Sequence, residues 1–306
     1  MEIEWVVTGL VWIRIGWFGL VWWWCVDGVV IDDGGAMEVG VVVGGEGVGL
    51  LVWVWVCCHR SGFGFVVGLG LPPGINEAVD KPNSAGYSDM IFHQLDLEDS
   101  ASISSLEDFI KTQFGTLDIL VIGENAKPLK ELVQQTHETA ENCLRTNYYG
   151  IKQLSKSLIP LLLLSNSARI VNVSSIAGQL KFISNENVRK ELEDIDGLTE
   201  EKLDKVVEGF LEDVKENLIE TKGWRVNFSA YFVSKAALNA YTRILASKYP
   251  KIAINSIHPR FVRTDINHNT GVMTTEEGAK GPVTLALMPE GGPSGLFFNT
   301  TEVSTF

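Results

Sequence analysis

The sequence predicts an α/β fold, with a doubly wound parallel sheet in a single domain that spans residues 1–306. Short continuous apolar runs, such as residues 119–122, are typical of strands buried on both faces of a parallel sheet. Longer stretches with helical periodicity, such as residues 131–164, lie between these runs. Strand and helix therefore alternate along the chain, which is also long enough to bury a full core.

Each element from residue 86 onward has its own signal. The stretch 102–110 has serines near a helix start and apolar residues on one face. The stretch 131–164 repeats apolar residues at helix-compatible spacings. In chain order, we expect a strand end at 91–97, a helix at 102–110, a strand at 119–122, a helix at 131–164, a strand at 170–173, a helix at 231–248 and a strand at 252–257.

The first 75 residues, where the first βαβ unit belongs, have an unusual composition. Eight of the nine tryptophans and half of the thirty glycines lie at or before residue 70. Two apolar runs, residues 5–26 and 39–58, have neither a helical nor an alternating period.

Three interpretations of this segment are open. It is a transmembrane hairpin, an authentic but degraded first βαβ unit, or non-native sequence translated from an intron or off-frame message. Arg14 and Glu46 interrupt the two apolar runs, which disfavours membrane insertion. We favour non-native sequence, because Trp, Gly, Val and Cys all have codons rich in G and T.

Charge and cysteine usage limit the classes of partner. The formal net charge of -13 disfavours nucleic acid and anionic membrane surfaces. The four cysteines show no C-x-x-C spacing and no accompanying histidine cluster, so neither a metal site nor a disulfide framework is indicated. We therefore expect a reducing, cytoplasmic setting.

Tyr231 and Lys235 form the most informative motif, Tyr-x-x-x-Lys. Residues four apart on a helix project from the same face. An ammonium held near a phenol favours the phenolate and lowers a pKa that is ordinarily about 10. The pair predicts a proton donor usable near neutral pH, and the alternative is a Tyr ring packed on a Lys stem.

Two further candidate active-site residues are Ser175 and Asn147. Ser174 and Ser175 follow the predicted strand at 170–173, and active-site groups gather beyond the carboxyl ends of such strands. The Ser175 hydroxyl either hydrogen-bonds a substrate carbonyl or caps the next turn. Asn147 lies inside a helical stretch, where an amide is neutral to unfavourable. We expect it either to support a water relay or to face solvent.

With these residues in this order, the sequence resembles the classical short-chain dehydrogenase/reductases. Within them it is most similar to the plant menthone reductase, neomenthol dehydrogenase and salutaridine reductase group. The resemblance covers about residues 86–306. The matching stretches are Phe-His-Gln-Leu-Asp at 92–96, residues 109–120, Thr-Asn-Tyr-Tyr-Gly at 146–150, Arg-Ile-Val-Asn-Val-Ser-Ser at 169–175, and residues 231–243 and 291–298.

The resemblance implies a Rossmann-like fold that binds NAD(P), and it assigns catalytic roles by motif. Tyr231 would be the general acid/base, and Lys235 would lower its pKa while holding the nicotinamide ribose. Ser175 would polarise and orient the substrate carbonyl. Asn147 would anchor a water that relays protons to Lys235.

The resemblance also assigns cofactor contacts outside the catalytic four. Gly9 ends the strand-like Val-Val-Thr-Gly at residues 6–9, where the family has its first glycine-rich turn. Asp96 matches the aspartate that contacts the adenine, and Thr264 matches the threonine that holds the carboxamide. Asn147, Tyr231 and Lys235 also belong to the cofactor site.

A long insertion separates the catalytic serine from the tyrosine. Fifty-five residues lie between Ser175 and Tyr231, many more than in most family members. We expect residues 180–228 to be helical, with an apolar stripe opposite acidic residues and lying over the active-site mouth; a plain acidic surface excursion is the alternative. In the resembling group such a lid accompanies a monomeric state. The stripe consists of Leu203, Val206, Val207, Phe210, Leu211 and Val214.

The cofactor half departs from the family pattern. Gly9 is followed by Leu-Val-Trp-Ile-Arg-Ile, where small residues are needed so that backbone N–H groups can hold a pyrophosphate. Glu124 stands in the stretch where the family has Asn-Asn-Ala-Gly. Arg260 replaces the glycine of a Pro-Gly turn, at a position that favours positive φ or a close cofactor approach.

The sequence thus predicts a reductase that transfers a hydride between NADPH and a hydrophobic, terpenoid- or alkaloid-like ketone or secondary alcohol, with NADH the less favoured cofactor. No nucleic-acid or membrane partner is expected. One alternative is a catalytically silent binding or scaffold protein that keeps the fold without holding cofactor, or a mistranslated product with the same defect. A membrane-anchored form that uses the Trp-rich start is another.

Overall fold

The computed structural model describes residues 90–123, 136–264 and 269–306, together with the backbone of five short strands upstream. Three of these strands form a separate antiparallel sheet in the order β1-β2-β3. The other two join the main sheet. The five are β1 (Ile3–Val6), β2 (Leu10–Ile13), β3 (Val21–Trp24), β4 (Trp53–Cys58) and β5 (Phe63–Gly68).

The main sheet has eight strands in the order β11-β10-β9-β8-β7-β4-β5-β6. Strands β7 to β10 are parallel to one another, and β5 is parallel to β6. The sheet is therefore mostly parallel, as predicted. The remaining bounds are β6 (Met90–Gln94), β7 (Ile119–Gly123), β8 (Arg169–Val173), β9 (Ala253–His258), β10 (Phe297–Asn299) and β11 (Glu302–Ser304).

One interior strand runs in the opposite direction. β4 is antiparallel to both of its neighbours, β5 and β7, and β11 is antiparallel to β10 at the edge. Since β4 reverses direction between them, β5 and β6 run the same way as β7 to β10. Six carboxyl ends therefore meet at one edge of the sheet, which is where ligands bind in such folds.

Val6, the described residue of the strand-like stretch 6–9, does not belong to this sheet. Val6 ends β1, which pairs with β2, and the place beside β7 is filled by β4. β4 is a run of Val, Trp and Cys, residues that suit a strand in the middle of a sheet. Gly9 lies outside the described residues.

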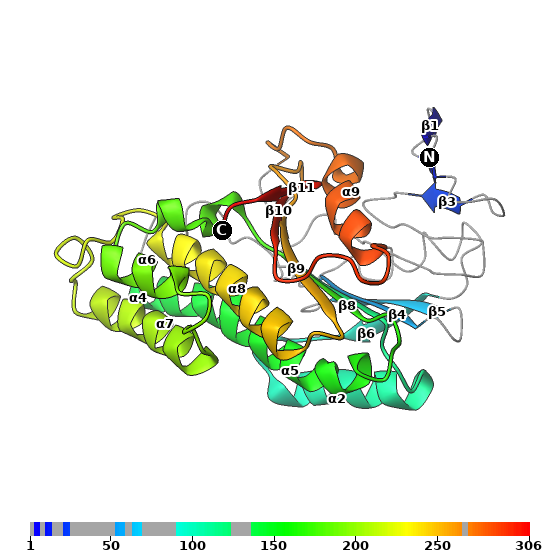
Figure 1. Ribbon diagram of the computed structural model, residues 1–306, viewed down its shortest axis with the longest axis horizontal. Helices are drawn as coiled ribbons and strands as arrows, with labels where there is room; N and C mark the ends of the chain where they lie inside the picture. The colour runs from blue at the N-terminus through cyan, green and yellow to red at the C-terminus, as the bar shows by residue number, and fades with distance from the viewer. Residues whose placement is uncertain are drawn as a thin grey trace.

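Helices cover both faces of the main sheet (Figure 1). α2 (Ser100–Gln113), α5 (Ile151–Leu162) and α8 (Ser229–Lys248) lie on one face, and α9 (Thr275–Ala286) lies on the other. Side chains of β7 alternate between two cores: Leu120 and Ile122 face the first, and Ile119 and Val121 face the second. The continuous apolar run thus indicated a doubly covered strand correctly.

The insertion between Ser175 and Tyr231 is helical, as predicted. It contains α6 (Glu186–Glu193) and α7 (Glu200–Lys215). The apolar stripe of α7 is buried in the larger core, and α7 packs against α4 (His137–Leu144) and α8. The stripe is therefore accounted for by helix packing, not by the active-site mouth. A covering role for the rest of the insertion stays a prediction.

Candidate active site

The predicted catalytic residues come from three elements that meet at the carboxyl edge of the sheet. Ser175 follows the end of β8, and Tyr231 and Lys235 lie in the first turns of α8. Asn147 lies in η1 (Arg145–Gly150), a turn of π-helix between α4 and α5. These elements are packed together: α8 contacts η1, β9 and the short helix η2 (Ile176–Gly178) that follows Ser175.

Lys235 fixes α8 to the end of β8. Its side chain is 1% exposed, and Nζ donates a hydrogen bond of 3.2 Å to the carbonyl oxygen of Val173. The ammonium also lies 5.8 Å from the centre of the Tyr231 ring. A buried ammonium requires hydrogen-bond acceptors, and the Val173 carbonyl supplies one.

Ser175 begins η2 directly after β8. Its Oγ accepts a hydrogen bond of 3.2 Å from the backbone N–H of Ala177, so the serine does cap the next turn. The backbone N–H of Ser174 donates to the carbonyl of Ile257 at 2.7 Å, which ties this turn to β9. A hydroxyl that accepts one bond can still donate another, so capping and carbonyl binding are compatible.

Asn147 reaches toward α8 and not toward solvent. Its Nδ2 donates a hydrogen bond of 3.1 Å to the Ser234 hydroxyl, which in turn donates to the Tyr231 carbonyl at 2.8 Å. The side chain is 5% exposed. Asn147 lies in a π-helical turn, and such turns occur frequently at functional sites. Asn147 is thereby linked to both catalytic residues of α8.

The residues predicted to contact the adenine and the carboxamide follow β6 and β9, whose carboxyl ends lie at the same edge of the sheet. Asp96 is exposed, two residues beyond β6, and its Oδ1 accepts a 2.8 Å hydrogen bond from the Glu98 N–H. Thr264 follows β9 by six residues, and its carbonyl accepts from Asn269 at 2.9 Å. Neither position is tested by a contact with the catalytic residues, so both roles stay predictions.

Two residues of unusual backbone conformation flank the site. Arg260 has φ 73°, which confirms that the family's glycine position requires positive φ. Phe228, the residue before α8, has φ 61°, a rare value for a bulky side chain. Such outliers concentrate at functional sites, where the surrounding structure holds them in place.

The sequence reasoning missed three residues of this site. Ser234 precedes Lys235, and its hydroxyl accepts a hydrogen bond from the Asn147 amide. Gly178 approaches α8 so closely that a Cβ would lie 2.7 Å from the Lys235 carbonyl oxygen. His258 ends β9, and its pKa is lowered to about 4, first by burial and then by the charges of Lys235 and Arg260. Its position at a strand's carboxyl end was the available signal for His258.

Within the described ranges, no helix has the length and apolarity needed to cross a membrane. In the same ranges, no group of His, Cys, Asp and Glu side chains is arranged to hold a metal ion.

Comparison with known sequences identifies related proteins along most of the chain. A sequence profile of the family described as short chain dehydrogenase matches residues 39–187. Salutaridine reductase of Papaver bracteatum is 44% identical over 305 residues, covering 88% of this chain and 96% of that protein. The (+)-neomenthol dehydrogenase of Arabidopsis thaliana is 46% identical over 249 residues, covering 75% and 84%. Human carbonyl reductase [NADPH] 1 is 35% identical, covering 87% and 98%.

A solved structure has the same fold. The structure of salutaridine reductase from Papaver somniferum superposes with a TM-score of 0.68 at 46% sequence identity, covering 73% of this chain and 86% of that one.

The profile match begins earlier than the resemblance predicted from residue 86. It includes residues 39–75, part of the segment of unusual composition. Gly9 precedes the match, whereas the glycine-rich run at residues 44–49, Gly-Gly-Glu-Gly-Val-Gly, lies inside it. This glycine-rich run was not among the cofactor contacts predicted from the sequence.

Proposed function

The chain belongs to the short-chain dehydrogenase/reductase family, and we propose that it transfers a hydride between NADPH and a hydrophobic ketone or the corresponding secondary alcohol. The observation that carries the proposal is the position of Lys235. Its ammonium is buried between the end of β8, which leads to Ser175, and the ring of Tyr231. This arrangement suits proton transfer to a carbonyl oxygen.

In this mechanism each side chain has a separate task. The Tyr231 hydroxyl protonates the substrate oxygen, and the Lys235 ammonium stabilises the phenolate that results. Ser175 donates a hydrogen bond to the same oxygen and fixes its direction. Asn147 supports the path by which Lys235 and Tyr231 regain a proton from solvent. NADPH, when bound, supplies the hydride.

The residues around the nicotinamide end fit such a cofactor. Lys235 offers donors to ribose hydroxyls, and the buried Ser174 hydroxyl has no hydrogen-bond partner within the described part of the chain. A buried polar atom of this kind calls for a ligand or water. The name of human carbonyl reductase [NADPH] 1 specifies the phosphorylated cofactor. For the pyrophosphate, we propose the glycine-rich run at residues 44–49, because glycines let backbone N–H groups approach phosphate.

The surroundings of the site favour an apolar substrate. Of the exposed large apolar side chains, Ile176 and Val226 lie within five residues of a predicted catalytic residue, and Phe261 and Val272 lie beyond the end of β9. Ile176 follows Ser175, and the Val272 N–H bonds the Phe261 carbonyl at 2.9 Å, just beyond β9. If these side chains form one apolar patch beside the site, it would suit a hydrophobic substrate. The named plant relatives, salutaridine reductase and neomenthol dehydrogenase, favour alkaloid- or terpenoid-like compounds.

We further propose that the protein is monomeric and cytoplasmic. The insertion helix α7 covers faces of α4 and α8 that would otherwise be available to a second subunit. The cysteine described in the structure, Cys143, is a buried free thiol, in keeping with a reducing compartment.

A direct test is NADPH titration followed by fluorescence, with reduction of a hydrophobic cyclic ketone as the activity assay. We expect saturable NADPH binding and turnover. Tyr231→Phe should retain binding but lose about 10²–10⁴-fold in kcat. Tyr249→Phe, at the far end of the same helix, is the matched control and should match wild type. A chain that binds no NADPH would favour the alternative, a catalytically silent scaffold.

A further inference from the structure

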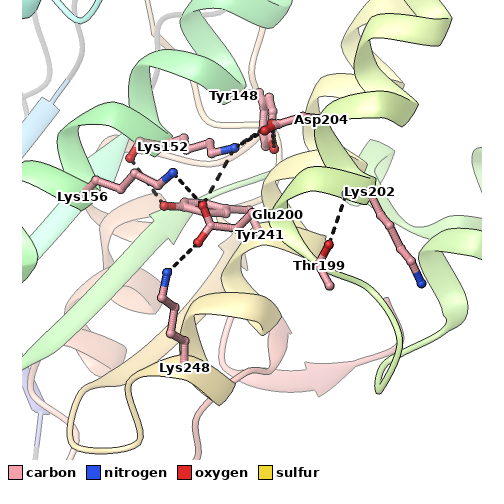
Figure 2. Close-up of polar contacts among 9 residues, drawn as sticks. All are labelled: Tyr148, Lys152, Lys156, Thr199, Glu200, Lys202, Asp204, Tyr241 and Lys248. Carbon is pink, nitrogen blue, oxygen red and sulfur yellow. Dashed lines mark hydrogen bonds and ion pairs between the residues drawn. The ribbon is translucent and has the colours of Figure 1, made fainter.

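The first two turns of α7 present two carboxylates to α5, which continues the π-helical turn of Asn147, and to α8, which carries Tyr231 and Lys235. Glu200 and Asp204 are four residues apart, and both face Lys152 of α5 (Figure 2). Residues at this spacing share one helix face. The insertion is therefore attached to α5 and α8 through specific polar contacts as well as through its apolar stripe.

Asp204 makes the shortest of these contacts. Its Oδ1 accepts a hydrogen bond of 2.8 Å from the Tyr148 hydroxyl, and both carboxylate oxygens lie 2.6 Å from the Lys152 ammonium. Tyr148 is fully buried, and the Lys152 ammonium lies 5.5 Å from the centre of its ring. Charge-assisted bonds of this length are the stronger class of hydrogen bond.

Tyr148 directly follows Asn147 in the π-helical turn η1. The opening residues of that turn are held by a different carboxylate: Glu98 pairs with Arg145 at 2.8 Å and accepts from the Thr146 hydroxyl at 2.9 Å. Asn147 thus lies between two anchored positions, one tied to the loop after β6 and one tied to α7. π-helical turns are uncommon and need such external support.

Small movements of this turn matter for Asn147. The bond from its amide to Ser234 is already 3.1 Å long, and a shift of several tenths of an ångström would take it beyond hydrogen-bonding distance. The Tyr148 hydroxyl anchors the neighbouring residue, so losing its acceptor releases the turn at the point nearest to Asn147.

Glu200 holds α7 against both α5 and α8. Its carboxylate is paired with Lys156 of α5 at 2.7 Å and with Lys248 of α8 at 3.0 Å. Burial alone would raise the Glu200 pKa, but the hydrogen bonds from Lys156 and Lys248 outweigh it and hold the pKa below its usual value. These ion pairs fix the turn of α7 that carries Asp204.

We propose that Asp204 is a positioning residue for the reaction: through Tyr148 it sets the place of Asn147 against Ser234 and Lys235. The proposal rests on the function proposed above. It gives the insertion a catalytic purpose, because α7 supplies the group that holds the proton-relay residue in place.

The test compares Asp204→Asn with Glu212→Gln. Glu212 lies two turns further along α7, is exposed, and pairs only with Lys215 of the same helix in the described part of the chain. For Asp204→Asn we expect kcat to fall about tenfold while KM for NADPH stays unchanged, because small misplacements cost rate more than binding. Tyr148→Phe should show the same loss, and Glu212→Gln none.

A double-variant cycle separates positioning from general stability. In an Asn147→Ala background, Asp204→Asn should lower kcat no further, because its effect passes through Asn147. An equal further loss would overturn the proposal. So would an unchanged kcat in the single variant.

Hydrogen exchange supplies a readout that needs no activity. Amides of residues 145–150 should exchange faster in Asp204→Asn than in Glu212→Gln. If the wild-type chain binds NADPH but reduces no ketone, the proposed function fails while exchange still reports on the turn. Unchanged exchange there would overturn the positioning role by itself.

Discussion

The side-chain amide of Asn147 is hydrogen-bonded to the hydroxyl of Ser234, the residue that immediately precedes Lys235. Ser234 also donates to the carbonyl of Tyr231, so one hydroxyl joins a π-helical turn to the helix that carries the proton donor. The relation between three of the four predicted catalytic residues, Asn147, Tyr231 and Lys235, thus depends on Ser234, which the sequence motif alone did not single out.

Replacing Ser234 with Ala removes the oxygen acceptor of the Asn147 amide and leaves it only the weaker contact with the Cys143 sulfur at 3.6 Å. The amide is buried, so it loses its bond without gaining solvent, and we expect kcat to fall several-fold with about 1–3 kcal/mol lost from the free energy of unfolding. Steady-state kinetics and urea unfolding measure the two effects. Ser247→Ala, at an exposed position of α8, should change neither.

Gly178→Ala should separate Ser175 from α8. The added Cβ would lie 2.7 Å from both the carbonyl carbon and the carbonyl oxygen of Lys235, and backbone atoms cannot yield as a flexible side chain can. We expect kcat to fall at least about tenfold. Gly209→Ala is the control: a Cβ there meets nothing, and alanine should stabilise α7 by about 0.5–1 kcal/mol. Wild-type kinetics in Gly178→Ala would contradict the close approach.

His258 makes stability depend on pH. Its folded pKa of about 4 lies below the ordinary value, because of burial and then the charges of Lys235 and Arg260. The unfolded chain therefore binds the proton first, and stability falls as pH drops from about 6.5 to about 4, by at most ~3 kcal/mol. Urea unfolding of His258→Gln should show a smaller loss over this interval. Equal losses in both proteins would refute the assignment.

Arg260→Gly should relieve strain beside the cofactor site. Arg260 adopts φ 73°, which costs a residue with a Cβ about 1 kcal/mol, so the variant should be more stable by that order. Removing the exposed side chain from a turn where the family has glycine should also lower KM for NADPH. Asn217→Gly, at φ 57° near the end of α7, is the control that alters backbone strain without altering KM.

The elements downstream of residue 86 could be predicted because their signals are local. The apolar run at β7 and the helical spacing of α7 report burial directly, and both were right. The candidate catalytic residues could be singled out because they belong to short motifs, and their roles stay predictions. The surroundings of α7 could not be predicted, because Asp204 meets Tyr148 and Lys152 across more than fifty residues of sequence.

The first strands of the main sheet were harder to predict from the sequence, for a physical reason. Val and Trp favour strands wherever they occur, so composition alone could not choose between Val6 and Trp53 as the neighbour of β7. An apolar run also does not indicate whether its strand will be parallel or antiparallel to its neighbours. The reversed course of β4 is a matter of pairing and leaves no mark on its residues.

The reversal of β4 affects the order in which the sheet can assemble. A parallel neighbour of β7 would have to wait for a long crossover to close, but β4 and β5 are antiparallel and only four residues apart in the chain. Such hairpins form in about 1–10 μs, well before distant segments meet. The sheet therefore contains, in its interior, a pair of strands that can form early and serve as a template for β7 on one side and β6 on the other.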